Sequence, residues 1–169
     1  MSGYDPRDWH DTSAPPPRAP RRWKWFLVAG GATIVADQIT KIAVRASIEP
    51  GGRIDVLPGF DLIRARNKGI AFGLLPGNRG LVIVLAFVAL GVIAFVLARL
   101  AHQSRAVAIG GGLLLGGSLG NLLDRLARGG VTDFLDLPVW PAFNVADIAI
   151  VAGAVTIALG LLRRAPDGE

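Results

Sequence analysis

The chain has 169 residues, of which 51% are hydrophobic and 18% are charged. Soluble domains of this size ordinarily carry more charge, so the composition indicates a membrane protein built as one unit. Cysteine is absent, which excludes disulfides, thiolate metal sites and cysteine nucleophiles. The net charge of +5 would suit nucleic-acid binding in a soluble protein, but much of it flanks apolar runs. Membrane lipids are the nearer partner there, and we expect no nucleic-acid partner.

The N-terminal segment 1–22 is rich in proline and poor in apolar residues. Such a segment cannot bury enough surface to offset its chain entropy, so we expect a disordered tail without catalytic work. A second, shorter tail is expected at 165–169. The residues between them, 23–164, are expected to form a single membrane domain.

Four apolar runs predict four transmembrane helices, at about 25–44, 81–98, 106–123 and 145–162. A helix of 18 residues reaches roughly 27 Å, enough for a slightly thin hydrocarbon core. The first run is too long for the apolar region of a cleaved signal peptide, and it contains Asp37 and Lys41. Helices are the expected spanning form because lipid offers no partner for backbone amides.

The connection between the first two spans has a strand-like pattern. Ile54 and Val56 alternate with charged neighbours, and Pro58-Gly59 is a turn signal before a second extended stretch at 60–66. The pattern predicts a small β-hairpin, or cradle, lying on the membrane. Asn67 follows it, either as a turn residue or as an amide that binds a peptide backbone.

The alternating directions of the four spans bring the unusual polar residues to one side of the membrane. These are Asp37, Lys41, Asn121, Arg125, Asp133, Asn144 and Asp147. His10 and His102 fall on the other side. Basic residues divide almost evenly between the two sides, although their density slightly favours cytoplasmic termini.

Several of these residues also have structural interpretations. Asp37 and Lys41 are four residues apart and can pair on one helix face, or Lys41 can extend to the headgroups. An isolated Asp in a span costs about 2.5–3.5 kcal/mol, so Asp37 should face protein or water. Arg125 can be an anchor at a helix end, and Asp124 beside it local support. Asn121 shares a helix face with Arg125.

Asp133 and Asp147 are the candidate catalytic pair. Asp133 is expected in a loop, and Asp147, preceded by Asn144, in the first turn of the fourth span, where it can also serve the helix dipole. Two adjacent carboxylates share one proton, so one can take a proton from water while the other donates one. A metal would need more ligands than this side offers, so we expect neither metal nor cofactor.

Two other function classes remain open from the residues alone. Intramembrane Asp and Lys can mark the pathway of a small transporter, although here they cluster on one side and no inverted repeat is visible. An assembly subunit would use the same charges for pairing only.

Five motifs together resemble the lipoprotein signal peptidase (signal peptidase II) family. They are Asp37-Gln38-Ile39-Thr40-Lys41, Asn67-Lys68-Gly69-Ile70-Ala71-Phe72-Gly73, the segment 116–125 (GGSLGNLLDR), Val131-Thr132-Asp133-Phe134 and Phe143-Asn144-Val145-Ala146-Asp147. The resemblance covers the chain after residue 22.

The resemblance implies an all-α membrane protein of four transmembrane helices, with the hairpin on the extracytoplasmic side between the first two. It implies an aspartic endopeptidase that cleaves diacylglyceryl-modified prolipoproteins before the lipidated cysteine. Asp133 and Asp147 would form the catalytic dyad, and Asn121 and Arg125 would position substrate.

The resemblance further places Asn67 and Asn144 near the site and makes Asp37 and Lys41 supporting residues. It also implies a bacterial plasma (inner) membrane location with cytoplasmic termini and an extracytoplasmic active site. The expected partners are the prolipoprotein substrate and membrane lipids, and we expect a monomer.

Overall fold

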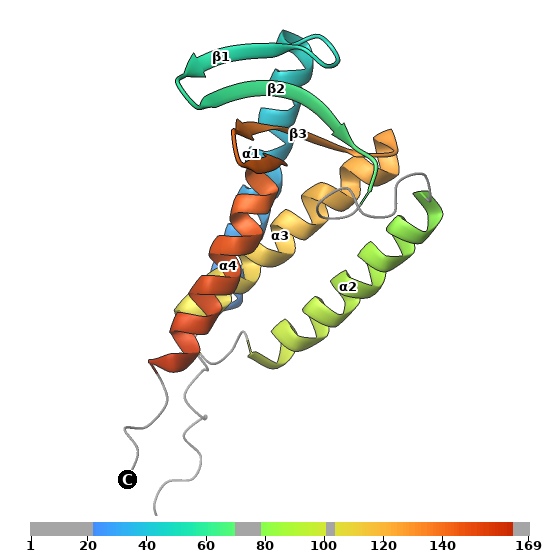
Figure 1. Ribbon diagram of the computed structural model, residues 1–169. Coiled ribbons are helices and arrows are strands. Elements are labelled where there is room, and N and C mark those ends of the chain that lie inside the picture. Colours follow the sequence, from blue (N-terminus) through green and yellow to red (C-terminus); the bar gives the residue numbers. More distant parts are fainter. Residues whose placement is uncertain (1–21, 70–78, 101–103, 164–169) are drawn as a thin grey trace, which may run out of the picture.

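The computed structural model describes residues 22–69, 79–100 and 104–163. Within these ranges the chain forms four helices and four strands, in the order α1, β1, β2, α2, α3, β3, β4, α4 (Figure 1). The predicted tails lie almost wholly outside the described residues, as do His10, His102 and the segment Ile70–Gly73 of the second motif.

The helices are α1 (Trp23–Ser47), α2 (Arg79–Leu100), α3 (Arg105–Arg128) and α4 (Val145–Leu162). All four described helices are long and apolar enough to cross a membrane. The predicted spans fall within them, and the fourth matches α4 residue for residue. The other helices extend further at both ends, because turns carrying interfacial residues continue the helix. α3, for example, passes Arg125 and stops where Gly129 adopts a left-handed conformation (φ 73°).

The strands are β1 (Arg53–Leu57), β2 (Phe60–Asn67), β3 (Val131–Leu137) and β4 (Trp140–Phe143). In the described chain they form one antiparallel sheet in the order β1-β2-β3-β4. The prediction of a loop at Asp133 is wrong, because Asp133 lies within β3 and is paired with Ala65 of β2. The pairing is non-local, because the β1-β2 hairpin precedes α2 whereas β3, which pairs with β2, begins more than sixty residues later in the chain.

Helix α3 packs between α1 and α4, with α2 against its side (Figure 1). Glycines on α3 make the close approach possible. A Cβ added at Gly112 would lie 2.4 Å from the Phe26 carbonyl oxygen of α1, and one at Gly117 would lie 2.4 Å from the Ala146 carbonyl oxygen of α4. The glycines of α3, including Gly117 in the segment 116–120, therefore allow the tight packing expected of membrane helices.

The sheet lies at one end of the helix bundle, opposite the Trp23 end of α1 and the Leu162 end of α4 (Figure 1). A small apolar core joins the two parts. Val44 of α1 and Ile48, which caps the end of α1, pack with Phe134 of β3, and Leu62, Leu135 and Val145 surround them. This core fixes β3 over the beginning of α4, where the polar residues gather.

Candidate active site

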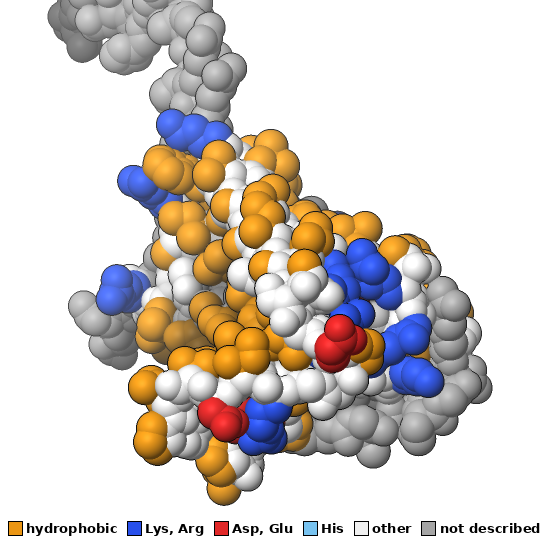
Figure 2. Space-filling view, turned by 90° about the horizontal axis from the view of Figure 1, so that it is seen from above, with side chains coloured by type: hydrophobic (Ala, Val, Ile, Leu, Met, Phe, Trp, Pro, Cys, Tyr) orange, Lys and Arg blue, Asp and Glu red, His pale blue; other side chains and the backbone are white. Residues whose placement is uncertain are grey.

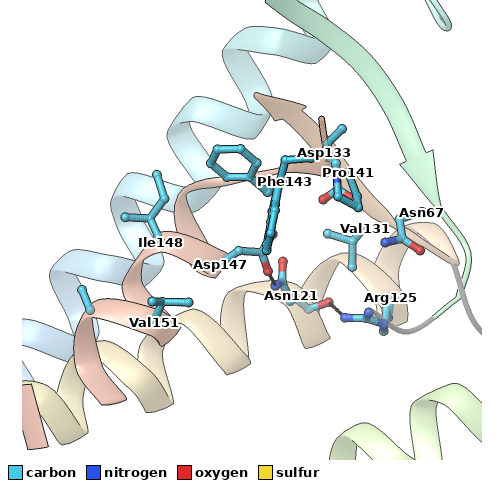
Figure 3. A pocket seen from close by; sticks show the side chains of 13 residues that line it. Asn67, Asn121, Arg125, Val131, Asp133, Pro141, Phe143, Asp147, Ile148 and Val151 are labelled. Atoms are coloured by element: carbon cyan, nitrogen blue, oxygen red, sulfur yellow. Dashed lines mark hydrogen bonds between the residues drawn. The ribbon is translucent and has the colours of Figure 1, made fainter. Parts of the chain in front are cut away.

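A cavity of about 640 Å³ lies at the junction of the sheet with α3 and α4 (Figure 3). Its polar lining comes from four elements and consists of Asn67, Asn121, Arg125, Asp133 and Asp147. Its apolar lining comes mainly from β4 and the first turns of α4: Trp140, Pro141, Ala142, Phe143, Ile148, Val151 and Ala152, with Val131 from β3. The cavity is therefore polar at one end and apolar along the side that descends α4.

Asp133 is the most enclosed acid of this cavity, with 4% of its surface exposed. Its Oδ1 accepts a hydrogen bond of 2.7 Å from Nδ2 of Asn144. The pKa of Asp133 is raised to about 6, mainly by burial and also by the nearby Asp147, against opposing effects of Asn144, Asn67 and Lys41. Near neutral pH, Asp133 is thus able to carry a proton.

Asp147 lies in the first turn of α4 and is only half-buried, so its carboxylate is accessible from the cavity. Its Oδ2 accepts from the backbone N–H of Asn144 at 3.1 Å, and its Oδ1 accepts from Nδ2 of Asn121 at 2.8 Å. Asn144 returns the contact, because its Oδ1 accepts from the Asp147 N–H and completes a capping box. A carboxylate is well placed at this positive end of the helix.

Asn144 joins the two acids. Its side chain is fully buried, donates to Asp133, and accepts from the backbone of Asp147. It also donates to Oδ1 of Asn121 at 3.1 Å. The two acids therefore border one cavity and share Asn144 as a hydrogen-bond partner.

Asp37 and Lys41 form a fully buried ion pair with Lys41 Nζ 2.9 Å from Asp37 Oδ2. This finding contradicts the alternative in which Lys41 extends to the headgroups, and it agrees with the prediction that Asp37 faces protein. Asp37 also accepts from the Ala146 N–H of α4 at 3.1 Å, while Lys41 donates to Asn121 Oδ1 at 2.9 Å. The pair lies behind the cavity and supports its residues from α1.

Asp124 supports the site from the other side. It is 1% exposed, and its Oδ2 accepts from the Thr132 N–H of β3 at 2.9 Å, next to Asp133. Its carboxylate also lies 3.6 Å from Lys41 Nζ. Sequence analysis treated it only as local support, and nothing in its spacing could show that it anchors β3.

Arg125 and Asn67 line the polar end of the cavity (Figure 3). Arg125 donates to the carbonyl oxygens of Asn121 at 3.3 Å and Gly69 at 3.2 Å. Asn67 accepts from the Gly69 N–H at 3.0 Å, so it stabilises a turn while its side chain still borders the cavity. The two interpretations of Asn67 are therefore compatible.

The apolar wall formed by β4 was missed by sequence analysis. Trp140 lines the cavity together with Pro141 and Phe143. Nothing in the sequence separates an aromatic residue that faces lipid from one that borders a cavity.

The described residues contain no group of three or more His, Cys, Asp or Glu side chains placed to hold a metal ion. The side-chain donors and acceptors of the cavity lining are two carboxylates, two amides, a guanidinium and the indole N–H of Trp140. Such a set can transfer protons and hold a peptide backbone.

Comparisons with known proteins agree on one family. The sequence model of the family described as signal peptidase (SPase) II matches residues 29–163 of this chain. The chain is 40% identical over 152 residues to the lipoprotein signal peptidase of Maridesulfovibrio salexigens, covering 83% of this chain and 97% of that one. It is 45% identical over 140 residues to the lipoprotein signal peptidase of Burkholderia thailandensis, covering 78% and 83%.

Two solved bacterial membrane enzymes share the fold. The first has a TM-score of 0.73 and 25% identity, covering 85% of this chain and 91% of its own. The second has a TM-score of 0.69 and 26% identity, covering 83% and 94%.

Proposed function

The chain belongs to the signal peptidase II family of membrane enzymes, and on that basis we propose that it is an aspartic endopeptidase acting on diacylglyceryl-modified prolipoproteins. It removes the signal peptide by cutting before the lipidated cysteine. The observation that carries this proposal is the shared contact of Asn144 with Asp133 and Asp147 in one cavity. Because the chain belongs to a family of enzymes, we favour an enzyme over a transporter or an assembly subunit.

The two acids divide the work of hydrolysis. Asp147, half-buried and accepting from two N–H donors, takes a proton from a water molecule. Asp133, with its pKa raised to about 6 by burial, gives its proton to the scissile carbonyl oxygen. The water oxygen bonds to the carbonyl carbon and gives a tetrahedral gem-diol. Its collapse breaks the C–N bond: the proton taken by Asp147 passes to the leaving amine, and one hydroxyl of the gem-diol returns a proton to Asp133.

Polar residues at the cavity's rim position the peptide. Arg125 and Asn67 offer donors at the end of the cavity away from α4's apolar face. Asn121 is engaged with Asp147 and holds that carboxylate in place. In this scheme Arg125 and Asn67 bind backbone oxygens, and the β1-β2 hairpin lies over the extended peptide.

The apolar wall suits the lipid part of the substrate. Ile148 and Val151 lie on the side of the cavity that descends α4, a helix apolar enough to span a membrane (Figure 3). A substrate entering sideways from the bilayer can keep its acyl chains along this wall while its peptide reaches the acids. The sheet end then faces the extracytoplasmic side of the plasma (inner) membrane, with cytoplasmic termini, and one copy of the chain suffices.

The test is reconstitution. Purified protein in phospholipid vesicles is incubated with a diacylglyceryl-modified prolipoprotein and with the same precursor lacking the lipid, and products are analysed by mass spectrometry. We expect cleavage of the modified precursor only, giving a product that begins with the lipidated cysteine. Equal cleavage of both precursors, or proton flux without cleavage, would contradict the proposal.

A further inference from the structure

A second cavity, of about 600 Å³, lies on the other face of the β2-β3 ladder. Successive residues of a strand point to opposite faces, and along β3 the two cavities follow that alternation. Asp133 and Asn67 border the first cavity, whereas their neighbours Thr132 and Arg66 border the second. The second cavity is therefore a separate space that hydrolysis does not use.

The described lining of this second cavity is strongly basic. It includes four arginines, contributed by the ends of α1 and α3 and by β2: Arg45, Arg64, Arg66 and Arg128. We call this space the basic cavity. Figure 2, which views the molecule from its sheet end, shows several Lys and Arg side chains (blue) close together on one side of this face, with an acidic side chain (red) beside them.

The arginines are not balanced by carboxylates. Asp124, buried beneath them, lies 3.5 Å from Arg45 Nη1 and 3.7 Å from Arg128 Nε. For Arg64 and Arg66, no carboxylate of the described residues lies within ion-pair distance. In the described chain, four positive charges therefore face one buried negative charge.

Main-chain contacts hold two of these guanidinium groups in place without neutralising them. Arg64 donates to the carbonyl oxygens of Arg45 and Ile48, both 3.0 Å away, at the end of α1. Arg66 donates to the carbonyl oxygen of Arg128 at the end of α3. The charges are thus fixed in position before any ligand arrives, which lowers the cost of binding one.

Arg45 has a buried guanidinium nitrogen that lacks a hydrogen-bond acceptor among the described residues. Its Nη1 donates to Thr132 Oγ1 at 3.0 Å, but its Nη2 is buried without a hydrogen-bond partner among the described residues. A buried charged donor without a partner costs free energy, and an anion in the basic cavity would satisfy it. Guanidinium groups suit phosphate in particular, because they form paired charge-assisted hydrogen bonds to its oxygens.

We propose that the basic cavity binds a phosphate group, carried by an anionic phospholipid of the surrounding leaflet or free in solution. The cavity lies where α1 and α3 end, at the level at which spanning helices meet lipid headgroups. Its size accommodates a glycerophosphate headgroup. Binding there would tie the sheet to the membrane surface on the side away from the acids.

The experiment measures affinity in a neutral detergent by thermophoresis, with dioctanoyl phosphatidylglycerol, dioctanoylglycerol and inorganic phosphate as the probes. The test variant is Arg66→Gln/Arg128→Gln, which removes two exposed charges of the basic cavity. The matched control is Arg53→Gln/Lys68→Gln, which removes two exposed charges from the same end of the molecule outside the cavity lining. Neither pair belongs to the catalytic cavity.

We expect saturable binding of the two phosphate-bearing probes and none of dioctanoylglycerol. The test variant should weaken binding at least about tenfold, as the loss of charge-assisted hydrogen bonds predicts, and the control should stay within about twofold of the parent. Tighter binding of phosphatidylglycerol than of phosphate identifies a lipid as the source, and equal binding identifies free phosphate. Equal weakening in both variants, or none in the test variant, would overturn the proposal.

A second measurement uses the unaltered chain, so that the result does not depend on a variant's folding. A photoactivatable phosphatidylglycerol analogue with its reactive group at the headgroup is cross-linked and mapped by mass spectrometry. Labels should concentrate at 45–51, 64–66 and 127–132. Labels spread evenly over the bundle would count against a defined site.

Discussion

Lys41 Nζ lies 2.9 Å from Oδ1 of Asn121, inside the helix bundle. An ammonium group can only donate, so Asn121 must turn its carbonyl oxygen to Lys41 and its NH₂ group to Asp147. A buried charge on α1 thereby determines which group the candidate catalytic acid of α4 meets. The supporting pair and the acids form one connected network.

Breaking the buried pair should destabilise the enzyme strongly. Lys41→Met leaves the Asp37 carboxylate buried without its cation. We expect the free energy of unfolding to fall by about 3–5 kcal/mol, which would appear as a lower thermal unfolding midpoint in detergent. Asp37→Asn/Lys41→Met should lose less, because no charge is left unpaired. Arg53→Gln serves as the control, because it removes only the surface ion pairs of Arg53 with Asp61 and Asp136 and should lower the free energy of unfolding by at most about 1 kcal/mol. A Lys41→Met midpoint equal to the control's would refute the buried-pair account.

Asn144 has two roles that substitution can separate. Asn144→Ser keeps a helix-capping oxygen but cannot reach Asp133, whereas Asn144→Ala loses both contacts. We expect Asn144→Ala to be less stable than Asn144→Ser by about 1 kcal/mol, with both variants losing kcat. A serine variant with unchanged kcat would show that the amide does not position the acids.

The raised pKa of Asp133 predicts how stability depends on pH. Folding raises this pKa from 3.8 to about 6, so between these values the folded state binds more protons than the unfolded state. The contribution of Asp133 to stability therefore falls as pH rises from about 4 to 6 and is constant above, a change of about 3 kcal/mol at most. Comparing the unfolding midpoints of the parent and Asp133→Asn across this range isolates it. Parallel curves would contradict the assignment.

Helix packing at Gly117 should tolerate no side chain. An added Cβ would lie 2.4 Å from the Ala146 carbonyl oxygen, so Gly117→Ala must push α4 away and displace Asp147 with it. We expect the free energy of unfolding to fall by about 1–3 kcal/mol and kcat to fall with it. Gly91 of α2 has nothing within 4 Å of an added Cβ, so Gly91→Ala should be neutral or slightly stabilising. Equal effects at the two positions would show that the contact between α3 and α4 is looser than described.

Local patterns predicted the helices well, because each apolar run by itself satisfies the requirement for a membrane span. The fourth prediction, 145–162, coincides with α4, where Asn144 caps the helix and fixes its start. The strand that contains Asp133 was harder to predict, because β3 forms by pairing with β2 from a distant part of the chain. Short segments whose partners are remote carry a weak local signal.

The gathering of polar residues followed from the directions of the spans alone, since each crossing reverses the chain. Which of them touch did not follow. The burial of Lys41 and the double contact of Asn144 depend on side-chain packing between α1, α3 and α4. The basic cavity was equally hidden, because its arginines come from three separate elements and look like ordinary interfacial charges in the sequence.

The most direct test replaces each acid singly. Asp133→Asn and Asp147→Asn are purified, reconstituted and assayed on diacylglyceryl-modified prolipoprotein, with Asp136→Asn as a control from the same sheet, outside the catalytic cavity. Both acid variants should remain folded and inserted in the membrane yet lose roughly 10²–10⁴-fold in cleavage rate, while the control cleaves normally. Cleavage at the parent's rate by either acid variant would contradict the two-acid mechanism.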